Sequence, residues 1–176
     1  MEAPTTAHLA AVKHLLRYIA STRRYGCKYI KVGTGGLIGY SESDMAGDID
    51  DRKSTSGNIF FLGGALITWQ LQKQKIAALS SCEAEYMAAT TAACQGIWLS
   101  RLSGDLFMEE VGCVTVFIDN KSAIQLFKNP VFHDRSKHID MRFHFIRRCV
   151  EEGKIRVEHI ATGDQLADIF TKLLGR

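Results

Sequence analysis

The sequence lacks the features that mark membrane proteins and disulfide-rich secreted proteins. No apolar run in the chain approaches the roughly 18 residues that span a bilayer, so we expect no membrane span. The cysteines are odd in number, irregularly spaced and without a CxxC pair, which argues against a disulfide framework or a zinc site. They are Cys27, Cys82, Cys94, Cys113 and Cys149. A reducing intracellular compartment, cytoplasm or nucleus, fits this pattern best.

Acidic residues are absent between Glu2 and Glu42, where every charged side chain is basic. The basic residues there are Lys13, Arg17, Arg23, Arg24, Lys28 and Lys31. A basic, acid-free amphipathic helix at the start of a chain is typical of a transit peptide, which would direct the protein to mitochondria. We prefer the simpler interpretation, a connecting helix with a solvated basic face. The net charge of +3 favours a polyanionic partner only weakly.

The first part of the chain predicts a helix and a linker. Pro4, Thr5 and Thr6 form a suitable helix start, and apolar residues then recur at helical spacing. These are Leu9, Val12, Leu16 and Ile19. The helix should end near residues 21–26, followed by a short strand at 25–32 and a glycine-rich link at 33–36. We therefore expect a connecting helix and linker over residues 1–36 and a separate domain over 37–176.

The remaining pattern predicts an α/β domain with a mixed sheet. Strands are expected at 37–43, 57–62 and 65–70, the last two joined by a tight hairpin at Gly63-Gly64 because both glycines accept positive φ. A long helix should follow a capping box at Ser80–Glu83. Further expected elements are a strand at 113–118, a helix at 120–128, a helix capped by Ser136, a strand at 154–160 and a helix after a capping box at 162–165. An antiparallel meander followed by alternating helices and strands implies a mixed five-stranded sheet covered by helices.

Acidic residues stand at positions where a metal site could assemble. Glu42 and Asp44 would share a face if the first strand continued that far. Glu85 lies early in the long helix, Asp119 ends an apolar strand and Asp168 falls inside the last helix. Each also has a purely structural interpretation: a solvent-facing strand residue, an acid favoured by the helix dipole, a helix cap and an exposed helix acid. Spacing alone does not decide between these interpretations.

Several blocks of local sequence resemble the ribonuclease H domain of copia-type LTR retrotransposon polyproteins. They are GYSESDMAGD at 39–48 with DRKSTSG at 51–57, ALSSCEAEYMA at 78–88, IDNKSAI at 118–124, NPVFH at 129–133 with KHIDMRFHFIR at 137–147, and DQLADIFTK at 164–172. They occur in the order that the family has and extend from about Leu37 to Leu174. The leading helix resembles the segment that joins reverse transcriptase to ribonuclease H. A polymerase is absent from the sequence, so we expect a stand-alone copy, retained by a host genome.

The resemblance implies a ribonuclease H-like fold and an endonuclease that cleaves the RNA strand of RNA–DNA hybrids with two Mg²⁺ ions, for which Mn²⁺ is a substitute. Its metal-binding and catalytic acids map onto Glu42, Glu85, Asp119 and Asp168. The family has Asp at the position of Glu42, and the added methylene moves that carboxylate by roughly one bond, so we expect impaired activity. Met45 and Leu173 also depart from the family, which commonly has Trp and Pro there.

Basic side chains near these blocks are candidates for contacts with the phosphates of a hybrid. They are Arg52, Lys53, Lys73, Lys75, Lys121 and Lys137. Zinc binding by His138, Asp140 and His144 is disfavoured, because the two histidines are about 240° apart around a helix. His159 is expected to be structural. The alternative function is a catalytically weak or inactive fragment that serves as a protein-binding module with an unidentified partner.

Overall fold

The computed structural model describes residues 3–29, 35–108, 112–128 and 137–172, without the side chains of 128 and 137–143. The chain divides into two units, Met1–Ile30 and Lys31–Arg176. None of the helices in the described ranges is both long and apolar enough to cross a membrane.

The first unit is built around one helix, α1 (Thr6–Thr22). Thr5 closes its N-terminus, because the Thr5 hydroxyl accepts a hydrogen bond from the His8 backbone N–H at 3.3 Å and His8 Nδ1 accepts one from the Thr5 N–H at 3.2 Å. The helix start and end agree with the sequence prediction. The strand predicted at 25–32 is wrong for its described part, since residues 25–29 form no strand and have no neighbouring strand to pair with. Residues 30–34 lie outside the described ranges.

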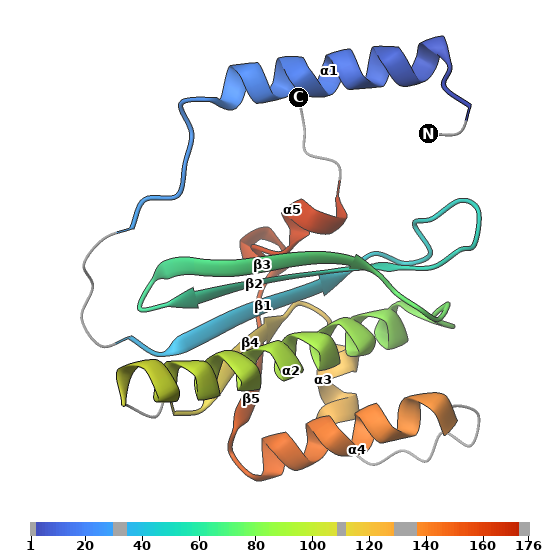
Figure 1. Ribbon diagram of the computed structural model, residues 1–176. Coiled ribbons are helices and arrows are strands. Elements are labelled where there is room, and N and C mark those ends of the chain that lie inside the picture. Colours follow the sequence, from blue (N-terminus) through green and yellow to red (C-terminus); the bar gives the residue numbers. More distant parts are fainter. Residues whose placement is uncertain (1–2, 30–34, 109–111, 129–136, 173–176) are drawn as a thin grey trace. The chain divides into compact units, whose positions relative to one another are not determined.

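A five-stranded mixed sheet forms the centre of the second unit, with strand order β3-β2-β1-β4-β5 (Figure 1). The strands are β1 (Leu37–Ser43), β2 (Thr55–Leu62), β3 (Ala65–Lys73), β4 (Val114–Ile118) and β5 (Ile155–His159). The pairs β1–β2 and β2–β3 are antiparallel, whereas β1–β4 and β4–β5 are parallel. The predicted meander and mixed sheet are thus confirmed.

Glycines shape two places in this sheet. Gly63 and Gly64 form the predicted β2–β3 hairpin with φ of 57° and 80°, values that β-carbon-bearing residues rarely adopt. Gly39 and Gly96 make room for the buried ring of Phe60, because a β-carbon would lie 2.4 Å and 3.3 Å from Phe60 Cε1. The long helix α2 (Ser81–Phe107) therefore approaches the sheet closely at Gly96.

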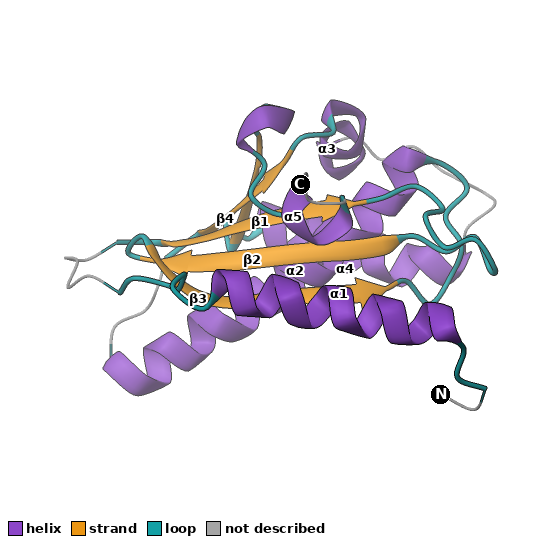
Figure 2. Cartoon of the chain, turned by 90° about the horizontal axis from the view of Figure 1, so that it is seen from above, coloured by secondary structure: helices purple, strands orange, loops and turns teal. Residues whose placement is uncertain are grey.

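Helices cover both faces of the sheet. Figure 1 shows α2 and α4 (Lys137–Glu151) on one side and the short α5 (Asp168–Thr171) on the other, and the view from above agrees (Figure 2). The core between α2, α4 and the sheet contains Phe60, Val116 and Ile146, all 1 % exposed or less. Helix α3 (Lys121–Lys128) follows β4 and is capped by Asn120, whose Oδ1 accepts from the Ala123 N–H at 3.0 Å. The Ser136 cap lies outside the described residues.

Both predicted capping boxes differ from the structure. Ser80 does cap α2, accepting from the Glu83 N–H at 3.2 Å, but the Glu83 carboxylate accepts from the Leu79 N–H rather than from Ser80. The box at 162–165 is wrong, because a 3₁₀ turn (Thr162–Asp164) forms there and Ala161 is its cap. Gln165 then interrupts the helix: its Nε2 donates to the Ser41 carbonyl and its Oε1 accepts from the Ala167 N–H. Asp168 consequently begins α5 instead of lying inside a longer helix.

Candidate metal centre

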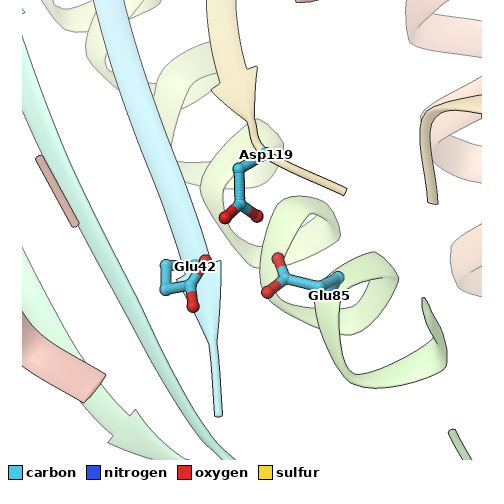
Figure 3. A group of neighbouring side chains, drawn as sticks. All are labelled: Glu42, Glu85 and Asp119. Atoms are coloured by element: carbon cyan, nitrogen blue, oxygen red, sulfur yellow. The ribbon is translucent and has the colours of Figure 1, made fainter. Parts of the chain in front are cut away.

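Three carboxylates from three separate elements converge at one end of the sheet. Glu42 comes from β1, Glu85 from α2 and Asp119 from the residue after β4, and Figure 3 shows them pointing toward one another. One oxygen of each lies within 4.8 Å of the others. The sequence separates them by more than 30 residues at each step, so only the fold brings them together. The predicted convergence of these residues is observed.

Glu42 is held at the point where α5 packs directly against the sheet. It pairs with Gly57 of β2, and a β-carbon on Gly57 would lie 2.7 Å from Phe170 Cβ and 3.2 Å from the Ala167 carbonyl oxygen. Only glycine therefore allows α5 to approach this closely. With α5 in place, the Glu42 side chain is 7 % exposed, which excludes the solvent-facing alternative.

Glu85 is fixed by a polar network behind the carboxylates. Its Oε1 accepts a hydrogen bond from the Ser43 backbone N–H at 3.1 Å. The buried Gln74 side chain donates to the Ser43 hydroxyl, the Ser56 hydroxyl and the Ala84 carbonyl at 2.9–3.0 Å. This amide joins β1, β2 and the first turn of α2, so it sets where Glu85 stands relative to Glu42.

Asp119 is oriented from the C-terminal segment of the chain. Its Oδ2 accepts a hydrogen bond from the Thr162 hydroxyl at 2.8 Å. Since Asn120 provides the cap of α3, the interpretation of Asp119 as a helix cap is wrong. Thr162 was expected to cap a helix, and its hydroxyl instead links the turn after β5 to the carboxylate cluster.

Asp168 adjoins the cluster through a lysine that the sequence interpretation did not single out. Lys172 Nζ lies 2.6 Å from Asp168 Oδ2 and 3.6 Å from Glu42 Oε1. Asp168 is not within the compact group of three, and the lysine stands between it and Glu42. The i,i+4 spacing of Asp168 and Lys172 is the signal that sequence reasoning had available, because such residues meet on a helix.

Crowding of carboxylates changes their acidity. Burial raises the pKa of Glu42, and the Asp119 charge raises it further, while Lys172 opposes both effects. Burial also raises the pKa of Glu85, and repulsion from Glu42 adds to it. The folded chain therefore retains protons here that ordinary glutamates lose, and a cation at this place would restore their ionised form.

The donor set fits a hard divalent cation. Among the residues that the structure describes, three buried carboxylate oxygens have no hydrogen-bond partner: Glu42 Oε2, Glu85 Oε2 and Asp168 Oδ1. Buried oxygens of this kind are costly unless a cation or a donor satisfies them. Carboxylate oxygens are the ligands that Mg²⁺ and Mn²⁺ prefer. Glu42, Glu85 and Asp119 would hold one such ion.

Asp44 does not contribute to this cluster. β1 ends at Ser43, and Asp44 Oδ1 accepts from the Thr55 N–H at 2.8 Å and from the Gly47 N–H at 3.4 Å. Its carboxylate therefore folds the loop between β1 and β2. The condition for Asp44 to share the face of Glu42 is therefore not met, because β1 ends at Ser43, as predicted.

The predicted nucleic-acid contacts fall into two groups. Lys53 and Lys73 are engaged within the β1–β2 loop region: Lys53 pairs with Asp51 at 3.2 Å, and Lys73 with Asp48 and Asp51 at 2.6 Å and 2.9 Å. Arg52, Lys75 and Lys121 are exposed, as Lys73 also is, but form no ion pair with another described residue; the side chain of Lys137 lies outside the described residues. His144 and His159 are exposed, and the side chains of His138 and Asp140 are not described.

Similar sequences occur in retrotransposon polyproteins and in one effector protein. No protein-family model matches the chain. All 176 residues align at 43 % identity with the retrovirus-related Pol polyproteins of transposon RE1 from Arabidopsis thaliana and of transposon TNT 1-94 from Nicotiana tabacum. The chain spans only 12 % and 13 % of those two proteins. A 97-residue stretch, 55 % of the chain, is 45 % identical to the secreted RxLR effector protein 161 of Plasmopara viticola, over 68 % of that protein.

Solved structures with the same fold have little sequence identity to the chain. The N-terminal RNase H domain of a Mycobacterium tuberculosis protein superposes with a TM-score of 0.57 at 12 % identity, over 78 % of this chain and 91 % of that one. LC11-RNase H1, isolated from compost and solved in complex with an RNA/DNA hybrid, gives 0.53 at 15 % identity, over 75 % and 91 %. These similarities establish the architecture of the sheet and its helices.

Proposed function

Because the chain belongs to the ribonuclease H-like domains of copia-type retrotransposon Pol polyproteins, we propose that it is a metal-dependent endonuclease of RNA–DNA hybrids. Its substrate would be the RNA strand of the hybrid. One observation carries this proposal. Glu42, Glu85 and Asp119, which come from three distant segments, meet in a cluster where one buried oxygen of Glu42 and one of Glu85 lack a hydrogen-bond partner among the described residues.

Each acid would have a distinct task. Glu42, Glu85 and Asp119 would hold the first divalent ion, and Asp168 would join Glu42 in holding the second. Two such ions activate water and stabilise the leaving oxygen of a phosphodiester. The chain itself supplies orientation: the Ser43 N–H fixes Glu85, and the Thr162 hydroxyl fixes Asp119. Such hydrogen bonds to ligand carboxylates hold the donor atoms in place before the ion binds.

Glutamate at position 42 sets the expected level of activity. Its extra methylene, compared with the aspartate of the family, displaces the carboxylate by roughly one bond length, and a misplacement of about 1 Å can cost about a hundredfold in rate. The backbone has little room to compensate, because Gly57, the partner of Glu42 in β2, packs directly against α5. We therefore propose a weakened activity that Glu42→Asp increases by about tenfold to a hundredfold.

The hybrid would be read through its backbone and its 2′-hydroxyls. Arg52, Lys75 and Lys121 have exposed side chains and would contact phosphates. Lys53 and Lys73 would contribute less, because their ammonium groups already pair with Asp51 and Asp48. Lys137 stays a prediction. Binding through phosphates would weaken steeply as salt concentration rises.

The test is a cleavage assay on the whole chain. A hybrid labelled on its RNA strand is incubated with Mg²⁺ or Mn²⁺, beside RNA duplex and DNA duplex of the same sequence. We expect cleavage of the hybrid alone, abolished by Asp119→Asn and kept by Asp164→Asn, which neutralises an exposed acid in the nearby 3₁₀ turn. Absence of cleavage by both the folded wild type and Glu42→Asp would refute the proposal.

A second candidate is a protein-binding module without catalysis. This candidate is favoured by the similarity to the secreted RxLR effector protein, which matches more than half of this chain and whose name describes an effector rather than a polyprotein. Under this proposal the fold is kept and the carboxylates are dispensable. Asp119→Asn would then leave the biological effect intact, and loss of that effect in a folded variant would refute the module.

A further inference from the structure

Lys172 lies beside the carboxylate cluster, between Glu42 and Asp168, where a metal ion would otherwise be attracted. Its backbone is anchored, because its N–H donates to the Asp168 carbonyl at 2.9 Å at the end of α5. Its side chain is half-exposed and places Nζ between Asp168 Oδ2 and Glu42 Oε1. A lysine carries its ammonium on a flexible four-carbon stem, so this charge can enter or leave the cluster without movement of the backbone.

We infer that the Lys172 ammonium is a tethered cation that competes with a divalent ion for the place between Asp168 and Glu42. This inference rests on the metal-dependent function proposed above and assigns a regulator to its second ion. A divalent ion that bridges the two carboxylates would coordinate their oxygens at about 2.1 Å. That place is taken by Nζ, at 2.6 Å from one carboxylate and 3.6 Å from the other, so the ion binds only after the ammonium leaves.

The competition concerns one side of the cluster. Glu85 and Asp119 form no ion pair with Lys172, and with Glu42 they make up the compact group in which the first ion would bind. Asp168 Oδ1 is buried without a hydrogen-bond partner in the described part of the chain. This free oxygen lies on the carboxylate whose other oxygen the lysine holds. The first ion would thus compete with the ammonium only at Glu42, whereas the second would bind more weakly because both of its acids pair with Lys172.

Direct measurement of Mn²⁺ binding to the whole chain tests this inference independently of cleavage. Free Mn²⁺ is followed by electron paramagnetic resonance during titration of the wild type, Lys172→Met and Lys172→Arg. We expect Lys172→Met to bind the second ion about fivefold more tightly, the ratio that corresponds to one ion pair at a half-exposed site, and Lys172→Arg to resemble the wild type. Lys154→Met is the matched control, because it removes a similarly exposed lysine that pairs with Glu152 away from the cluster.

A second variant locates the effect. Adding Asp168→Asn to Lys172→Met should remove the gain, because the released place is then missing one carboxylate. Second-ion affinity in Lys172→Met that equals or falls below that of the wild type would overturn the inference, as would an equal gain in Lys154→Met. If neither the wild type nor Lys172→Met binds Mn²⁺, the inference is also wrong. Cleavage of the hybrid without tighter second-ion binding in Lys172→Met would overturn the inference and leave the proposed function standing. Tighter second-ion binding without cleavage by the wild type or Glu42→Asp would overturn the proposed function and leave the inference standing.

Discussion

Replacing Glu42 by Gln tests the idea that the carboxylate cluster destabilises the metal-free chain. Burial and neighbouring charges raise the pKa of Glu42 and of Glu85 above the ordinary value of 4.5. The folded chain then binds these protons more tightly than the unfolded chain. The free energy of unfolding therefore falls as the pH rises from 4.5 through the raised pKa values. Glu42→Gln keeps the shape of the side chain and removes its repulsion of Glu85 and Asp119.

The magnitude follows from the surroundings of Glu42. Burial and the Asp119 charge raise the pKa of Glu42 from 4.5 to about 7, and one pKa unit corresponds to about 1.4 kcal/mol. The loss of the 3.6 Å ion pair with half-exposed Lys172 offsets less than about 1 kcal/mol. We expect Glu42→Gln to raise the free energy of unfolding by about 1–2 kcal/mol at pH 8. At pH 5 the change should be much smaller, because in the folded wild type the Glu42 carboxyl is then largely protonated.

Urea unfolding followed by circular dichroism, with EDTA present, measures this difference at both pH values. Glu158→Gln is the control, because it neutralises an exposed acid on β5. Destabilisation by Glu42→Gln at pH 8, or an equal change at pH 5 and pH 8, would refute the reasoning. A parallel titration with Mg²⁺ should stabilise the wild type and leave Glu42→Gln unchanged, since the variant has lost a ligand of the first ion.

Three further measurements examine the fold around the cluster. Gly57→Ala should lower the free energy of unfolding by about 1–3 kcal/mol, because its β-carbon would lie 2.7 Å from Phe170 Cβ; urea unfolding measures it, and an unchanged midpoint would show that α5 yields freely. Gly163→Ala, with nothing within 4 Å, is its control. Gln74→Leu should lower the free energy of unfolding by about 2–3 kcal/mol and weaken Mn²⁺ binding, because the Ser43 hydroxyl and two further buried acceptors lose their hydrogen-bond donor. A variant with unaltered stability and unaltered Mn²⁺ affinity would contradict this role. Mg²⁺ should raise the melting temperature more at pH 8 than at pH 6, because the raised pKa values of Glu42 and Glu85 leave fewer ionised carboxylates at pH 6. Differential scanning fluorimetry measures the two shifts, and a larger shift at pH 6 would count against a carboxylate site.

Much of the sheet was accessible to sequence reasoning because its strands have strong local signals. β1 was predicted with the bounds it has, and the Gly63-Gly64 turn was predicted from the permissive φ of its two residues. β3 continues to Lys73, three residues beyond the predicted end, because β2 supplies a pairing partner as far as Thr55. The sequence pattern did not reveal this extension, because the last three residues of β3 are mostly polar.

The site was predictable as a set of acids and not as a set of contacts. Local patterns placed Glu42 in a strand, Glu85 early in a helix and Asp119 at the end of a strand. The family resemblance then indicated that these acids form one metal site. The capping box at Thr162 failed, because its hydroxyl has a partner 43 residues away in sequence. Lys172 was missed for a similar reason, since one of its two ion-pair partners, Glu42, lies on β1.

The crowding of acids has a consequence for how such a sequence drifts. In a lineage selected for stability alone, uncharged replacements of Glu42, Glu85, Asp119 and Asp168 would be favoured. Each such replacement relieves electrostatic repulsion that opposes folding. The family resemblance implies aspartate at position 42, and the glutamate found there is also an acid. An amide or a hydroxyl at this position would relieve the repulsion, whereas glutamate retains the acidic group. A reconstructed genealogy of this locus would be expected to record purifying selection on charge at these codons.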